Sequence, residues 1–118
     1  MPNEMIQPMS EDTRATIYTM TCFAYLELDE RGRLRTGGSR TFGYYTNRDW
    51  AIEDMHCNNC DMWERTYDYA VIEAMREGVH SDCDEEIWFK YDQERNGFFE
   101  IPKPEAVIKS HRCNFAFG

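Results

Sequence analysis

Residues 87–101 have the sequence IWFKYDQERNGFFEI, which is two short aromatic and apolar runs on either side of Asn96-Gly97. Asn-Gly is the dipeptide that most readily forms a two-residue hairpin turn, because both residues tolerate left-handed backbone conformations. Runs rich in β-branched and aromatic residues favour strands. We therefore predict a β-hairpin with strands at 87–92 and 98–101, ended by Pro102 and Pro104.

Three further strands are predicted nearer the N-terminus. From Ala15 to Leu28 the even positions from Tyr18 onward are apolar or aromatic, which indicates a long strand with one buried face. The polar run 29–32 ends in Gly32 and suits a hairpin turn, so the returning strand would start at Arg33. After Gly37-Gly38-Ser39, residues 41–45 are rich in aromatic side chains and indicate another strand.

One main helix is expected at residues 47–58. Thr46 precedes Asp49 by three residues, which approximates a capping box, while Trp50, Ala51 and Met55 supply an apolar stripe. The next segment, 61–75, fits either a helix or a strand, and we predict a short helical turn at 61–66 followed by a strand.

These elements define an α+β fold with a small, mainly antiparallel sheet, hairpins at 29–32 and 96–97, and one main helix near 47–58. A chain of 118 residues is long enough to bury a core as a single domain without disulfides or metal. Residues 1–13 hold two prolines among polar residues and are expected to be a flexible leader. The single α+β domain would then span 14–118.

The charge balance limits the partners. Twenty-two Asp and Glu against thirteen Lys and Arg give a net charge of −9. Phosphate backbones and anionic membrane surfaces repel such a protein, so neither direct nucleic-acid binding nor membrane association is expected. No signal peptide or membrane span is apparent, and five cysteines without an export signal imply reduced thiols and a cytoplasmic location.

The densest acidic run is the best candidate for a binding surface. Its members are Asp82, Asp84, Glu85 and Glu86. Complementary charge accelerates docking onto a basic groove of another protein, although a charge run is also typical of a merely solvated face. The sequence leaves both interpretations open.

Cysteine and histidine offer an alternative. A zinc module would use Cys57, Cys60 and two of His80, Cys83, His111 and Cys113 as ligands. Only Cys57 and Cys60 have the C-x-x-C spacing, and a domain of this size does not need metal to fold, so we favour no cofactor while zinc remains possible.

An enzyme with a Cys-His pair is a third hypothesis, and the sequence favours it less. There is no glycine-rich phosphate loop, nucleophile elbow or HExxH motif, so no residue is assigned a catalytic role.

Several motifs resemble a family. The segments that carry the resemblance are 42–45 (FGYY), 60–64 (CDMWE), 67–73 (YDYAVIE), 77–78 (EG) and 114–118 (NFAFG). They are similar to small uncharacterised phage and prophage proteins of Gram-positive bacteria. The resemblance implies a phage-encoded protein that binds and inhibits a host protein, such as an anti-CRISPR that occupies the basic nucleic-acid groove of a CRISPR effector or another defence nuclease. It assigns no catalytic residue, and the basic stretch from Arg31 to Arg40 argues against full-surface DNA mimicry.

Overall fold

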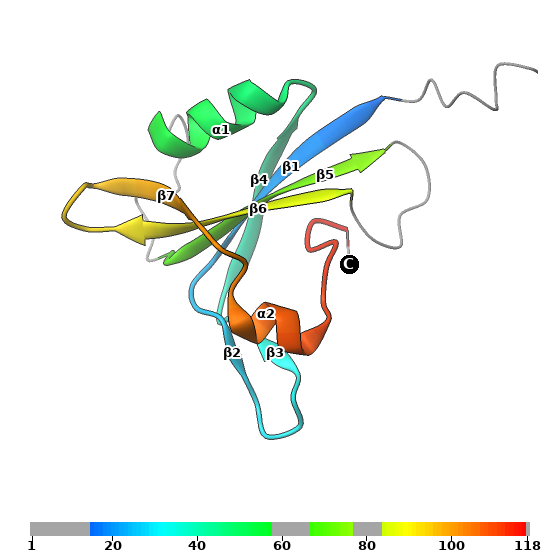
Figure 1. Ribbon diagram of the computed structural model, residues 1–118, viewed down its shortest axis with the longest axis vertical. Helices are drawn as coiled ribbons and strands as arrows, with labels where there is room; N and C mark the ends of the chain where they lie inside the picture. Colours follow the sequence, from blue (N-terminus) through cyan, green and yellow to red (C-terminus); the bar gives the residue numbers. More distant parts are fainter. Residues whose placement is uncertain (1–14, 58–66, 77–83, 118) are drawn as a thin grey trace, which may run out of the picture.

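The computed structural model describes residues 15–57, 67–76 and 84–117. Its centre is a five-stranded antiparallel sheet with the order β4-β1-β5-β6-β7 (Figure 1). The strands are β1 (Thr16–Phe23), β4 (Ser39–Tyr45), β5 (Tyr69–Arg76), β6 (Glu85–Asp92) and β7 (Gly97–Ile101). The α+β class and the antiparallel sheet predicted from the sequence are confirmed.

The remaining elements cover the two faces of this sheet. Helix α1 (Arg48–Cys57) lies on one face, whereas helix α2 (Glu105–Ser110) lies on the other beside the small hairpin of β2 (Glu27–Leu28) and β3 (Leu34–Arg35) (Figure 1). The helix predicted at 47–58 and the hairpin turn predicted at 29–32 are therefore confirmed. The turn predicted at 61–66 and the leader at 1–13 fall outside the described residues.

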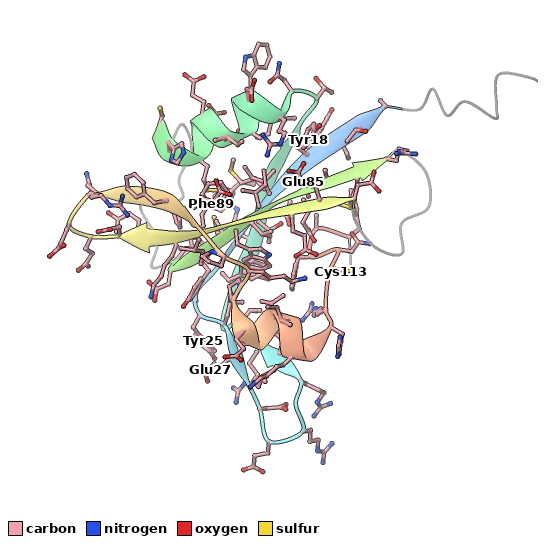
Figure 2. The ribbon with its side chains drawn as sticks, viewed as in Figure 1. Tyr18, Tyr25, Glu27, Glu85, Phe89 and Cys113 are labelled. Atoms are coloured by element: carbon pink, nitrogen blue, oxygen red, sulfur yellow. The ribbon has the colours of Figure 1, made fainter. Side chains whose placement is uncertain are left out.

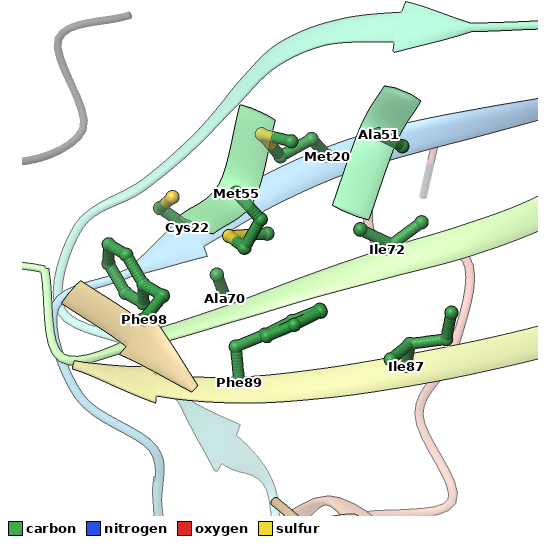
Figure 3. Close-up of a cluster of buried hydrophobic side chains, with 9 residues drawn as sticks. All are labelled: Met20, Cys22, Ala51, Met55, Ala70, Ile72, Ile87, Phe89 and Phe98. Carbon is green, nitrogen blue, oxygen red and sulfur yellow. The ribbon is translucent and has the colours of Figure 1, made fainter. Parts of the chain in front are cut away.

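Alternation along the strands divides the core into two clusters. On the α1 side, Ala51 and Met55 pack over apolar side chains from β1, β5, β6 and β7 (Figure 3). On the α2 side, Val107 packs with Phe23, Val71 and Trp88. Adjacent residues such as Val71 and Ile72 are both fully buried, because the central strands are covered on both faces.

The long strand predicted over 15–28 is interrupted. β1 ends at Phe23, and the backbone N–H groups of Ala24 and Tyr25 donate to the carbonyls of Gly38 and Thr36 at 2.8 and 3.1 Å. These two bonds lead the chain out of the sheet and into the separate β2–β3 hairpin. The alternation of apolar residues continues past Phe23, so the sequence pattern does not indicate where β1 ends.

The hairpin around residues 96–97 exists, but it does not have the two-residue turn that the Asn-Gly pair predicted. Asp92 pairs with Gly97, which leaves four residues in the loop, and only Asn96 of the Asn-Gly pair has a positive φ, at 58°. The Asp92 side chain accounts for the longer loop, because its Oδ1 accepts the N–H groups of Glu94 and Arg95 at 2.9 and 3.1 Å. Gly97 is thereby the first residue of β7.

Within the described residues, no helix is both long enough and apolar enough to span a membrane.

Candidate protein-binding surface

Helix α1 packs on the sheet through one defined face, and its opposite face is polar and exposed. Asn47 begins the helix, since its side-chain oxygen accepts the N–H of Trp50 at 3.0 Å and its carbonyl accepts that of Ala51 at 3.2 Å. Asn47, and not the predicted Thr46, is thus the cap. Ala51 and Met55 lie one turn apart and are fully buried. At 100° per residue, their burial turns Glu53 to the outer face of the helix.

Trp50 does not join the buried stripe of α1, as the sequence suggested it would. Its side chain is 63% exposed, which is unusual for a residue of this size. It lies one turn before Asp54, whose carboxylate accepts the Tyr45 hydroxyl of β4 at 2.6 Å. Trp50 therefore projects from the side of α1 that is nearer to β4.

Exposed carboxylates share this side of the sheet. Asp49 and Glu53 lie one turn apart on α1, and Glu100 of β7 is on the same side because it pairs with Phe89 of the α1-side core. None of these three forms an ion pair within the described part of the chain. Arg48 is already engaged, since it donates two hydrogen bonds to Glu85, at 2.9 and 3.3 Å, which raise the pKa of Arg48. We name Asp49, Trp50, Glu53 and Glu100 the acidic face.

The acidic run singled out in the sequence is divided by the sheet. Glu85 faces α1, whereas Glu86 faces α2, where it accepts hydrogen bonds from Trp88 Nε1 at 2.9 Å and from Lys103 at 3.3 Å. Asp84 lies 3.6 Å from the Arg76 guanidinium, and Asp82 is outside the described residues. Each described member of the run thus has a cationic partner, and its role in binding stays a prediction.

The opposite side of the molecule carries basic residues. Helix α2 packs against the β2–β3 hairpin, which projects from the sheet (Figure 1). The basic side chains on these elements and their flanks are Arg31, Arg33, Arg35, Lys103, Lys109 and Arg112. The carboxylates there are Glu27, Asp29, Glu30 and Glu105. We name this region the basic pole. It holds Arg31, Arg33 and Arg35 of the basic stretch in the sequence, whereas Arg40 lies on β4 on the α1 side.

Glu73 lies at the centre of the α2 side and is completely buried. Its carboxylate accepts the backbone N–H of Asn114 at 2.7 Å and that of Phe115 at 2.9 Å. Burial raises the pKa of Glu73, and its cross-strand neighbour Glu86 raises it further, while the backbone N–H groups act in the opposite direction. The hydrogen bonds hold the C-terminal residues against the sheet.

A pocket of about 210 Å³ opens beside the residues that Glu73 holds. It lies between strand β4 and the C-terminal residues. Its walls include Ile17, Thr19, Thr41, Tyr44, Ala116 and Phe117. Tyr44 and Phe117 are 67% and 57% exposed, so the rim of this pocket is aromatic and open to solvent.

The cysteine and histidine residues proposed as zinc ligands are only partly described. Cys57 ends α1 on one face of the sheet, whereas His111 and Cys113 follow α2 on the other (Figures 1 and 2). Cys60, His80 and Cys83 lie outside the described residues. No group of three metal-ligating side chains forms within the residues that the structure describes. A zinc site that uses Cys57, Cys60, His80 and Cys83 stays a prediction.

Sequence reasoning missed the acidic face and Glu73. Glu73 had a visible signal, because it is the one charged residue in the apolar run from Ala70 to Met75. Asp49 and Glu53 could have been grouped by their helical spacing, but Glu100 joins them only through the sheet register. Comparison with protein-family models, with curated proteins and with solved structures gives no match to this chain.

Proposed function

We propose that this chain acts by binding a partner protein, and that the acidic face contacts a basic surface of that partner. The observation that supports this most is an exposed tryptophan beside carboxylates that have no cationic partner within the described residues. Tryptophan is among the residues that contribute most binding energy at protein interfaces, and unpaired carboxylates accelerate encounter with a basic surface. Trp50 would be the anchor, and Glu53 and Glu100 would supply carboxylates on the same side of the sheet.

The resemblance to phage proteins supplies the setting for this proposal. The partner is then a host defence protein, such as a CRISPR effector or another defence nuclease, with a basic groove that normally holds nucleic acid. A carboxylate face in that groove excludes the phosphate backbone, because both compete for the same Lys and Arg side chains. Inhibition follows from occupancy alone and requires no chemistry by this chain.

Capture of proteins from a bacterial lysate tests the proposal. Tagged wild-type protein is compared with the double variant Glu53→Lys, Glu100→Lys at low and moderate salt. We expect capture of a nucleic-acid-handling protein by the wild type, a loss of at least tenfold in the double variant, and weaker capture as salt rises.

The matched control is the double variant Glu27→Lys, Glu30→Lys, which makes the same change in net charge at the basic pole. Both residues are exposed, like Glu53 and Glu100. We expect its capture to stay within twofold of wild type. An equal loss of capture in both double variants would show that the loss follows from the change in net charge and not from the acidic face. Undiminished capture by Glu53→Lys, Glu100→Lys would exclude the acidic face as the binding surface.

A further inference from the structure

The two outer strands of the sheet are protected to different degrees. Strand β7 has five residues, carries Glu100, is followed by Pro102 and Pro104, and lies against α1. Charged side chains, prolines and covering helices are the usual means of preventing an outer strand from pairing with another chain. Strand β4 has seven residues, and Arg40 is its one charged residue. In the sheet that the described residues form, β4 pairs on one side only, with β1.

A bulge in β4 directs its side chains toward the pocket. Thr41 pairs with Thr21 of β1 and Tyr44 pairs with Thr19, so these two β4 residues share a face although they are three positions apart. The extra residue, Phe42, packs edge-on against Tyr67 with ring centroids 5.8 Å apart. The pocket therefore lies over β1 and β4 on the α2 side, next to the strand whose outer edge pairs with no other described strand.

The pocket has the size of one apolar side chain. A protein cavity of roughly 150 Å³ accommodates benzene, so about 210 Å³ gives room for a leucine or phenylalanine side chain. Strand addition at a sheet edge obtains affinity from main-chain hydrogen bonds and specificity from pockets that accept alternate side chains. Both components occur together at β4.

The charges around β4 indicate what the added strand carries. Side chains of an added strand alternate between the two faces of the sheet, so every second one would lie on the α1 side. That side holds Asp54, which is bonded to Tyr45 at one end of β4, and Arg40, which pairs with Cys22 of the α1-side core near the other end. Lys or Arg would therefore be favoured beside Asp54, and the net charge of −9 favours a basic segment as a whole. A second copy of this chain, with its net charge of −9, would be repelled.

We propose that the outer edge of β4, which pairs with no strand among the described residues, binds an extended segment of the partner protein as an additional strand. Apolar side chains of the segment enter the pocket between Tyr44 and Phe117, and the alternate Lys or Arg side chains lie on the α1 side. This inference rests on the proposed function, because the segment is taken to belong to the partner protein proposed there. It goes beyond the acidic face in assigning a second site and the class of peptide that the site takes.

The test uses a blocked synthetic peptide, Lys-Val-Lys-Leu-Lys-Val-Lys, with a scrambled peptide of the same composition, Lys-Lys-Val-Val-Leu-Lys-Lys, as control. We expect saturable binding of the alternating peptide at least tenfold tighter than that of the scrambled one. Amide hydrogen exchange in β4 should slow at least tenfold on binding. N-methylation of the peptide at one set of alternate residues should abolish binding, whereas methylation at the other set should leave it.

Protein variants locate the site. Tyr44→Ala and Phe117→Ala should each weaken peptide binding at least fivefold. Ile108→Ala should not, because Ile108 is similarly exposed, at 51%, but lies on α2. Equal binding of the two peptides, no protection of β4, or no effect of the Tyr44 and Phe117 variants would overturn the inference. A dimer in sedimentation equilibrium that dissociates with Tyr44→Ala would also overturn it, because a second copy would then occupy the edge.

The two proposals fail separately. Lysate capture that depends on Glu53 and Glu100 but not on Tyr44 or Phe117 would overturn this inference and leave the proposed function intact. Peptide binding at β4 without any captured partner would overturn the proposed function and leave the peptide site.

Discussion

Glu73 links the interior of the sheet to the pocket at its edge. A buried carboxylate is costly unless it is well hydrogen-bonded, and here the donors are backbone N–H groups at Asn114 and Phe115. Phe115 then packs edge-on against Phe23, with ring centroids 5.0 Å apart. Two residues further along, Phe117 reaches the rim of the pocket. One side chain thus places a wall of the proposed peptide site.

Replacing Glu73 by Gln should destabilise the protein, because the amide keeps one acceptor oxygen but directs an NH₂ group at backbone donors. We expect a loss of about 1–3 kcal/mol in the free energy of unfolding at acid pH, measured by urea denaturation. The exposed substitution Glu94→Gln is the control and should change little. Glu73→Gln should also weaken binding of the peptide at β4, because the substitution loosens the hydrogen bonds that hold the residues before Phe117.

The pH dependence of this loss has a definite sign. Because the pKa of Glu73 is raised on folding, the folded protein holds that proton more tightly than the unfolded chain. The stabilisation is complete below the ordinary glutamate pKa of 4.5 and is lost as pH rises through the raised folded pKa. The gap between wild type and Glu73→Gln should therefore narrow as pH rises. A gap that widens would show that the hydrogen bonds outweigh burial and lower the pKa.

At the scale of elements, the exit from β1 into the β2–β3 hairpin depends on one glycine. Gly37 has a φ of 73°, and a Cβ atom there would lie 2.5 Å from a ring carbon of Tyr25. Gly38 has neither constraint, because a Cβ at that position meets no atom within 4 Å. Only a residue without a side chain fits at Gly37.

Gly37→Ala should destabilise the protein by more than the roughly 1–2 kcal/mol that a left-handed alanine costs, since the Tyr25 ring must also move. Gly32→Ala should incur only the backbone cost, because Gly32 has a φ of 78° in open space. Gly38→Ala should be neutral within about 0.5 kcal/mol. Thermal or urea denaturation of the three variants gives this order, and equal losses for Gly37→Ala and Gly32→Ala would show that Tyr25 gives way without cost.

An element could be predicted from the sequence when the interactions that define it are local along the chain. The strands around residues 87–101 and the helix near 47–58 have local signals in hydrophobic period and turn residues, and both are present. The end of β1 at Phe23 has no local signal, because hydrogen bonds to residues 36 and 38 cause it. The four-residue loop before Gly97 depends on hydrogen bonds to the Asp92 side chain. The Asn-Gly pair predicted a two-residue turn instead, because it is the stronger local signal.

At the scale of the molecule, the sheet separates charge. The acidic face lies on the α1 side and the basic pole on the α2 side, a division that net charge alone cannot reveal. Strand alternation also divides Glu85 from Glu86, so neighbours in the sequence belong to different surfaces. The candidate site could therefore be predicted from the sequence as acidic, but its position required the register of the strands.

The most direct test of the acidic face is the substitution of its aromatic anchor. Trp50→Ser and Ile108→Ser each remove an exposed apolar side chain, from α1 and from α2, and neither changes the net charge. Capture of the partner from lysate should fall at least tenfold with Trp50→Ser and stay within twofold of wild type with Ile108→Ser. Full capture by Trp50→Ser, or an equal loss with Ile108→Ser, would contradict the assignment of the acidic face as the binding surface.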